Sequence, residues 1–161
     1  MLKQLVDRAN ILTYLGLLVA MFGVHMCFIN RTDIAIICLA FCGICDGFDG
    51  TFAKKVRKTK DEGFGTQLDS LVDVLSSGMF PIIICYSIGF NKPINMIVYF
   101  VFILSGVIRL SYYNIYGKDD SKSFTGIPIT TSTIVLPILY YFFRNEIAIM
   151  IALVTLRMFI C

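Results

Sequence analysis

The sequence predicts an all-α integral membrane protein with six transmembrane helices and a short interfacial helix at its N-terminus. Hydrophobic residues make up 57% of the 161 residues, and charged residues only 16%. The mean hydropathy is +0.79, which excludes an ordinary soluble domain. The apolar residues also come in runs of about 20, the length that crosses the hydrocarbon core of a bilayer. Such spans leave little room for anything else, so we expect residues 1–161 to form a single membrane domain.

The elements follow one another in a regular order along the chain. Residues 1–10 mix apolar and charged side chains, as an amphipathic helix at the membrane surface does. The predicted spans then cover residues 10–29, 34–53, 67–88, 94–115, 128–143 and 147–160. Short connections at 30–32, 91–93 and 144–146 fall on one side, and longer charged ones at 54–62 and 116–126 fall on the other.

The distribution of basic residues predicts the orientation. The side with the longer connections carries Lys3, Arg8, Lys54, Lys55, Arg57, Lys58, Lys60, Lys118 and Lys122, and the other side carries Arg31, Lys92 and Arg144. Positive charge is retained in the cytoplasm. We therefore expect the cytoplasmic membrane of a bacterium, with both termini and the functional site facing the cytoplasm.

Four aspartates, Asp46, Asp49, Asp69 and Asp73, lie within or at the edge of two apolar segments. Their three- and four-residue spacings place each pair on one face of a helix. Two adjacent helices could therefore direct four carboxylates at one point, where they would repel one another unless a divalent cation, or two, bound there. Mg²⁺ and Mn²⁺ both suit an all-carboxylate site.

The aspartates belong to a longer pattern that resembles the signature of the CDP-alcohol phosphatidyltransferase family, D-x-x-D-G-x-x-A-R followed by G-x-x-x-D-x-x-x-D. The matching positions are Asp46, Asp49, Gly50, Ala53, Gly65, Asp69 and Asp73, with Lys54 in place of the arginine. The spacer before Gly65 is longer than usual by two residues. Asn10 and Thr13 are similar to the N-x-x-T of the family's first helix, and Ser77, Gly78 and Pro81 follow the second aspartate pair as expected.

The resemblance implies a six-helix fold, a homodimer, and two Mg²⁺ or Mn²⁺ ions. It makes Asp46, Asp49 and Asp69 metal ligands and Asp73 the general base, which also touches a metal. An acceptor alcohol then displaces CMP from a CDP-linked lipid, here CDP-diacylglycerol drawn from the lipid bilayer. The residues implied to bind this lipid are Asn10, Thr13, Asp49, Gly50, Ala53, Lys54, Gly65 and Asp69.

Arg109 and Asn114 are the predicted acceptor-binding residues. An arginine within an apolar segment is costly and by default indicates function. The stretches around Arg109 and residues 124–128 are similar to segments of serine-using members of the family, although Tyr112 replaces their second arginine. A guanidinium pairs bidentately with a carboxylate, which favours L-serine as the acceptor. Glycerol 3-phosphate or an inositol-type alcohol is the alternative acceptor. Arg109 itself could instead be structural and pair with Asp73 or with a carbonyl at a helix end.

Several other features are interpreted as structural. The six cysteines fall mostly in apolar runs, so we expect packing residues and no disulfide, and the pair Cys42 and Cys45 is not expected to bind zinc. The run 130–133 is expected to pack between helices, with an acceptor pocket as the alternative, and His25 is expected at a helix contact. No nucleic-acid partner is expected. A divalent-cation or ion-coupled carrier remains the alternative to an enzyme, although no inverted repeat is visible.

Overall fold

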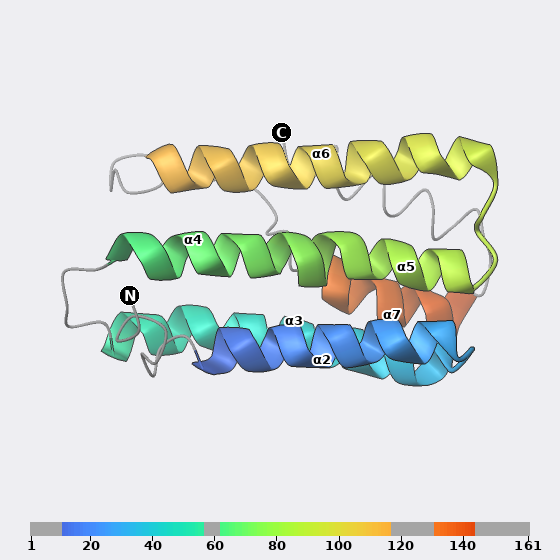
Figure 1. Ribbon diagram of the computed structural model, residues 1–161, viewed down its shortest axis with the longest axis horizontal. Helices are drawn as coiled ribbons and strands as arrows, with labels where there is room; N and C mark the ends of the chain where they lie inside the picture. Colours follow the sequence, from blue (N-terminus) through green and yellow to red (C-terminus); the bar gives the residue numbers. More distant parts are fainter. Residues whose placement is uncertain (1–10, 57–61, 117–130, 144–161) are drawn as a thin grey trace.

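The computed structural model describes residues 11–56, 62–116 and 131–143, and all regular structure there is helical (Figure 1). The elements are α2 (Ile11–Phe28), α3 (Thr32–Val56), α4 (Glu62–Asp73), the π-helical turn η2 (Val74–Met79), α5 (Phe80–Ser87), α6 (Pro93–Tyr116) and α7 (Thr131–Phe143). Three stretches are long and apolar enough to cross a membrane, namely Ile11–Phe28, Gly65–Ser87 and Pro93–Tyr112. The all-α membrane class is therefore confirmed, while the predicted span 147–160 and the interfacial helix 1–10 lie outside the described residues.

The helix boundaries differ from the prediction at the charged connection. The sequence predicts a loop over 54–62, but α3 continues to Val56 and α4 already begins at Glu62. The prediction was wrong because lysine and glutamate favour helix as well as solvent, so charge alone does not end a helix. Helices α3 and α4 thus extend beyond the apolar runs.

Helix α2 packs against α3 through small side chains. Its buried residues recur every three or four positions, at Thr13, Gly16, Ala20, Gly23 and Cys27. Small residues at this spacing let two membrane helices approach closely. A Cβ at Gly23 would overlap the ring of Phe80 and lie 2.9 Å from the Cβ of Cys38. His25 is on the exposed side of α2, so its predicted role at a helix contact was wrong.

Helices α4 and α5 form one continuous rod through η2, and in Figure 1 this rod lies between α6 and the pair α2 and α3. Pro81 lies in the first turn of α5. Because proline has no N–H, it cannot bond to the carbonyl of Ser77 four residues earlier, and the α-helical pattern is interrupted there. The π-helical turn η2 begins directly after Asp73 and ends two residues before this proline.

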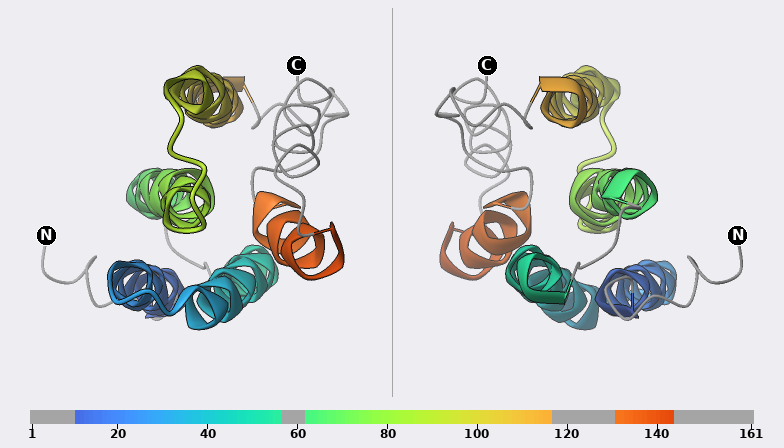
Figure 2. Two further views of the ribbon diagram at one scale, coloured as in Figure 1. Left: turned by 90° about the vertical axis from the view of Figure 1, so that its right-hand side faces the viewer. Right: turned by 90° about the vertical axis from the view of Figure 1, so that its left-hand side faces the viewer.

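The remaining helices flank this rod on two sides. Helices α2 and α3 pack together on one side of it, α7 packs against α3 and also reaches η2 and α5, and α6 lies on the other side (Figure 2). Among the buried residues, the largest with almost no exposure are Ile36, Leu39, Phe80, Ile84 and Leu136. All five cysteines of the described residues are buried, which confirms that they are packing residues.

Two turns end helices at the same end of the bundle. Asn30 has φ 59°, and the following N–H of Arg31 donates to Met26 O at 2.9 Å. Gly89 has φ 110°, and the N–H of Phe90 donates to Cys85 O at 3.1 Å. Both are left-handed C-terminal caps, which asparagine and glycine adopt most readily. They reverse the chain from α2 into α3 and from α5 into α6.

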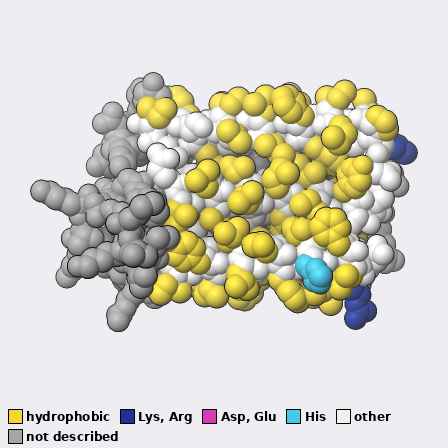
Figure 3. All heavy atoms as spheres, viewed as in Figure 1, with side chains coloured by type: hydrophobic (Ala, Val, Ile, Leu, Met, Phe, Trp, Pro, Cys, Tyr) yellow, Lys and Arg dark blue, Asp and Glu magenta, His cyan; other side chains and the backbone are white. Residues whose placement is uncertain are grey.

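The surface is largely apolar between the two ends. Figure 3 shows hydrophobic side chains along the length of one face, with Lys or Arg at one end of it. The exposed large side chains come from every long helix, including Leu18, Phe22, Leu71, Phe100 and Tyr141. Such a belt suits contact with lipid and would be unfavourable in water.

Candidate metal centre

Three of the four predicted aspartates meet between α3 and α4. Asp46 lies on α3, and Asp69 and Asp73 lie one turn apart on α4. One carboxylate oxygen from each residue lies within 4.8 Å of the other two, and all three side chains are half-buried. The predicted convergence is therefore present for these residues. Asp49 follows Asp46 by one turn of α3, but its side chain lies outside those that the structure describes.

The carboxylates border a small cavity to which three helical segments contribute. Its other lining residues are Leu12, Thr13 and Gly16 from α2, Cys42 and Cys45 from α3, and Val72 and Ser76 from the α4–η2 region. A volume of about 10 Å³ is open to a water-sized sphere, which is room for about one such occupant. Thr13 is only 8% exposed, so the predicted first-helix residue does face this cavity.

Local sequence explains how the cavity is built. Helix α3 contacts α2 at Gly16: a Cβ there would lie 3.9 Å from the Cβ of Cys45, an ordinary contact, and the Sγ of Cys42 donates to Gly16 O at 3.4 Å. Beyond Asp73, the Oγ of Ser76 donates to Val72 O at 2.9 Å, so this hydroxyl bonds within its own helical segment. Four of the lining residues were not predicted from the sequence, namely Gly16, Cys42, Cys45 and Ser76. Their spacing of one turn from an aspartate or from Thr13 was the available signal.

The donor set fits a hard divalent cation. Carboxylates bring negative charge together at this point, and like charges at such distances destabilise one another. A divalent cation offsets this repulsion, and oxygen-only ligands favour Mg²⁺ or Mn²⁺ over softer metals. Asp46, Asp69 and Asp73 are thus the described residues that could hold the ion.

The other predicted nucleotide-site residues lie at the same end of α3 and α4. Gly65 is buried on α4, one turn before Asp69. Gly50, Ala53 and Lys54 are on the last turns of α3, and their surroundings lie outside the described part of the structure, as does Asn10. The helical backbone places these three residues within three turns after Asp46.

The predicted acceptor residues Arg109 and Asn114 are both on α6. Asn114 Nδ2 donates to Ser70 Oγ at 2.9 Å, and Ser70 immediately follows Asp69. Arg109 is half-buried, and it is not among the residues that border the carboxylate cavity. Asn114 is therefore hydrogen-bonded to α4, the helix that carries Asp69 and Asp73, and Arg109 lies five residues earlier on α6.

Ser132 and Thr133 of α7 pack between helices, as predicted, whereas Thr130 and the side chain of Thr131 lie outside the described part of the structure. Ser132 Oγ donates to Ser77 O at 2.9 Å, and both residues are buried. Thr133 has no exposed surface, and a Cβ at Gly43 would overlap its Oγ1. These two residues hold α7 against η2 and α3.

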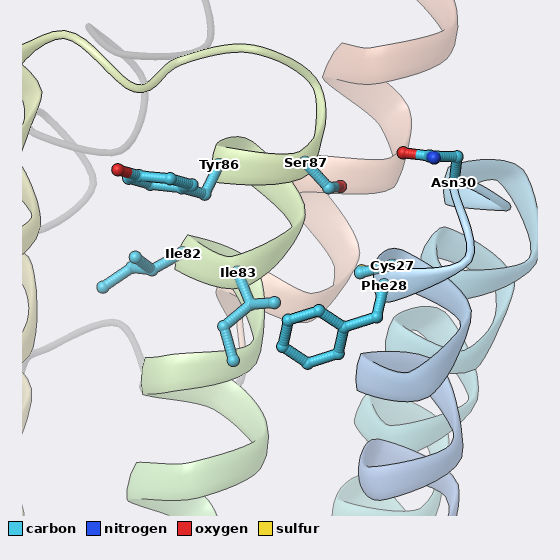
Figure 4. Close-up of a pocket in the computed structure, with 7 residues that line it drawn as sticks. All are labelled: Cys27, Phe28, Asn30, Ile82, Ile83, Tyr86 and Ser87. Carbon is cyan, nitrogen blue, oxygen red and sulfur yellow. The ribbon is translucent and has the colours of Figure 1, made fainter.

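A second cavity lies at the opposite end of the bundle, between the ends of α2 and α5 (Figure 4). It has a volume of about 380 Å³ and is lined by Cys27, Phe28, Asn30, Ile82, Ile83, Tyr86 and Ser87. Its walls are mostly apolar, and it contains none of the predicted site residues. We assign it no role in the chemistry of the aspartates.

Comparison with known proteins identifies the family of this chain. The sequence model of the CDP-alcohol phosphatidyltransferase family matches residues 7–159. The chain is 32% identical over 128 residues to an archaetidylserine synthase of Methanothermobacter thermautotrophicus, which covers 79% of this chain and 52% of that protein.

Two further relatives are named CDP-diacylglycerol–serine O-phosphatidyltransferase. The one from Helicobacter pylori is 38% identical over 96 residues, covering 58% of this chain and 40% of the relative. The one from Saccharomyces cerevisiae is 34% identical over 108 residues, covering 61% and 38%. The chain thus spans about half, or less, of the length of these relatives.

Proposed function

Because the chain belongs to the CDP-alcohol phosphatidyltransferase family, we propose that it transfers a phosphatidyl group from CDP-diacylglycerol to L-serine and releases CMP. This reaction would serve phospholipid biosynthesis. The observation that carries the proposal is the convergence of Asp46, Asp69 and Asp73 within 4.8 Å at the edge of the predicted nucleotide site. Family membership gives the carrier hypothesis no support.

The donor would bind where α2, α3 and α4 meet. Two divalent ions held by Asp46, Asp49, Asp69 and Asp73 would neutralise the diphosphate and stabilise the charge that develops on the departing CMP. The cavity beside these aspartates holds only about one water-sized occupant, so the lipid's diphosphate would approach from outside it. Lys54 would supply positive charge to the phosphates, without the bidentate geometry of an arginine.

The transfer itself is a displacement at phosphorus. The serine hydroxyl oxygen forms a bond to the phosphorus of the phosphatidyl group, and the bond from this phosphorus to the oxygen of CMP breaks. We assign the hydroxyl proton to a carboxylate oxygen of Asp73, which acts as the general base. Asp73 is half-buried and ends α4, so its position is fixed by both α4 and the π-helical turn that follows.

Serine is favoured as the acceptor by the relatives and by Arg109. All three relatives described above are named serine-using synthases. Arg109 is a cation within an apolar span, and its guanidinium can pair with the serine carboxylate through two hydrogen bonds. Glycerol 3-phosphate or an inositol-type alcohol would be the acceptor if Arg109 served a structural purpose.

The proposal also covers the cellular setting. The enzyme would lie in the cytoplasmic membrane of a bacterium, with the aspartates toward the cytoplasm, because the basic segment 57–61 follows in the sequence the end of α3 that carries Asp46. The expected assembly is a homodimer, by analogy with the family.

CMP release tests the proposal. The purified chain in detergent would receive CDP-diacylglycerol and Mg²⁺ or Mn²⁺, with L-serine, glycerol 3-phosphate or myo-inositol in separate reactions. We expect release that requires both the metal and L-serine. Release with another acceptor would show that serine is not the acceptor but would keep the reaction class. Absence of CMP release with every acceptor would contradict the proposed transferase activity. Asp33→Asn is the matched control, because Asp33 is exposed on the first turn of α3, away from the cavity.

A further inference from the structure

We infer that Ser70 and Asn114 are a positioning pair that fixes α6, and with it Arg109, relative to the aspartates of α4. The Nδ2 of Asn114 donates to Ser70 Oγ at 2.9 Å, and Ser70 Oγ also lies 3.0 Å from Thr66 O and 3.2 Å from Asn114 Oδ1. A serine hydroxyl has a single proton. It can donate to Thr66 O while it accepts from Asn114, so that one oxygen joins the two helices.

The position of Ser70 on α4 makes this bond relevant to the site. Ser70 is next to Asp69 and three residues before Asp73, which places it about 100° and about 60° around the helix from them. The aspartates face the cavity between α2, α3 and α4, and Ser70 meets α6 on the adjacent side. A shift of α6 would therefore move a contact that adjoins the proposed metal ligands.

Helix α6 lies at the edge of the described bundle. It contacts the described part of the bundle chiefly through α4 and η2, and it lies apart from α2 and α3 in both end-on views (Figure 2). At the opposite end of α6, the hydroxyl of Tyr99 donates to Phe90 O at 2.8 Å. Tyr99 and Asn114 are fifteen residues apart, or about 22 Å along the helix. Two hydrogen bonds at this separation help to set both the axial position and the rotation of α6.

Arg109 lies between these two points. It precedes Asn114 by five residues, about 8 Å along the axis. The inward side of α6 is marked by Tyr99, Phe102 and Gly106, which are buried, and Arg109 and Asn114 fall at its opposite edges. The Ser70–Asn114 bond would then hold Arg109 at the position along α6 where it can pair with the carboxylate of L-serine. Asn114 itself need not touch the substrate.

The kinetic part of this inference rests on the proposed function. Hydrogen bonds between membrane helices contribute about 0.6 kcal/mol on average and about 1.7 kcal/mol at most. We therefore expect Ser70→Ala and Asn114→Leu each to raise the KM for L-serine roughly threefold to tenfold. The KM for CDP-diacylglycerol should change less than about twofold. Ser70→Thr, which keeps the hydroxyl, should have the wild-type KM for L-serine.

A double variant tests whether the two residues act as one unit. Ser70→Ala combined with Asn114→Leu should be no worse than the more affected single variant, because each alone already removes the bond. If the increase in the KM for L-serine in the double variant equalled the product of the two single increases, the residues would act independently and the pairing would be overturned. Ser105→Ala is the matched control, since Ser105 is also on α6 and its hydroxyl bonds only within that helix, to Phe102 O at 3.0 Å. It should leave both KM values unchanged.

A distance measurement separates failure of the pair from failure of the proposed function. Spin labels at Gln67→Cys and Ser111→Cys would report on α4 and α6, since both positions are exposed. The five described cysteines are buried, and Cys161→Ser removes the sixth. Asn114→Leu should broaden or shift the distance distribution even if the chain releases no CMP. An unchanged distribution would overturn the inference, whether or not the wild-type chain is active.

Discussion

The hydroxyl of Ser132 donates a hydrogen bond of 2.9 Å to the main-chain carbonyl of Ser77, fifty-five residues earlier in the chain. This carbonyl lacks its usual α-helical donor because the residue four positions later is Pro81. Helix α7 thus supplies a donor where the proline removes one. The bond fixes the π-helical turn directly after Asp73, and π-helical turns within α-helices are frequent at functional sites.

Ser132→Ala should destabilise the bundle because it removes the hydroxyl donor from a buried carbonyl. The expected loss is about 1 kcal/mol, between the mean for hydrogen bonds in membranes and the cost of an unsatisfied buried group. Denaturant unfolding in detergent would measure it. Ser105→Ala, which removes a hydroxyl that bonds within its own helix, serves as the control. Equal stability of Ser132→Ala and wild type would show that this bond contributes nothing.

Gly43→Ala should destabilise the protein more strongly. A Cβ at Gly43 would overlap Thr133 Oγ1 and lie 2.9 Å from Thr133 Cβ, so α7 would have to move away from α3. Overpacking of this kind costs about 1–3 kcal/mol. Gly47→Ala, one turn later on the same helix, meets no atom within 4 Å and should not lower stability, since alanine favours helix more than glycine does. Thermal unfolding of the two variants side by side tests the contrast, and a stable Gly43→Ala protein would refute it.

Asp73→Asn should lower kcat about 10²-fold to 10⁴-fold, because the proposed general base is lost. Binding of CDP-diacylglycerol should persist, since Asp46 and Asp69 still lie within 4.8 Å of each other. CMP release and equilibrium binding of the lipid would be measured on the same preparation. Turnover at the wild-type rate would remove Asp73 from the role of base.

Arg109→Lys should raise the KM for L-serine roughly tenfold, because a lysine keeps the charge but cannot form two parallel hydrogen bonds with a carboxylate. The KM for CDP-diacylglycerol should change little. Steady-state kinetics with each substrate varied in turn would separate the two effects. Equal changes in both KM values would make Arg109 a structural residue.

Asp69→Asn should weaken Mn²⁺ binding, measured by the paramagnetic resonance signal of the free ion, because it removes one of three carboxylates from the cluster. Addition of a chelator should abolish CMP release by the wild-type chain, and Mg²⁺ or Mn²⁺ should restore it. Asp33→Asn removes an exposed carboxylate near Tyr140, outside the cluster, and should leave Mn²⁺ binding intact. If both variants bound Mn²⁺ as the wild type does, Asp69 would not be a ligand.

Much of the site could be predicted because it depends on local spacing. The four-residue interval between Asp69 and Asp73 places both on one face of a helix, whatever surrounds it. The hydroxyl of Ser132 was likewise expected to pack between helices, because polar side chains in membrane spans seek partners on neighbouring helices. His25 was misplaced because a single histidine in an apolar run gives no information about which side of its helix is covered.

The sequence by itself determined the membrane class, the order of the described helices and the pairing of aspartates along each helix. These follow from hydropathy and helical period, which are properties of short segments. Only the tertiary structure decided that Ser70 bonds to Asn114, that Ser132 reaches Ser77, and that Gly16 and Ser76 border the carboxylates. Such contacts join residues far apart in the chain, and they depend on helix rotation and close approach, which no local pattern specifies.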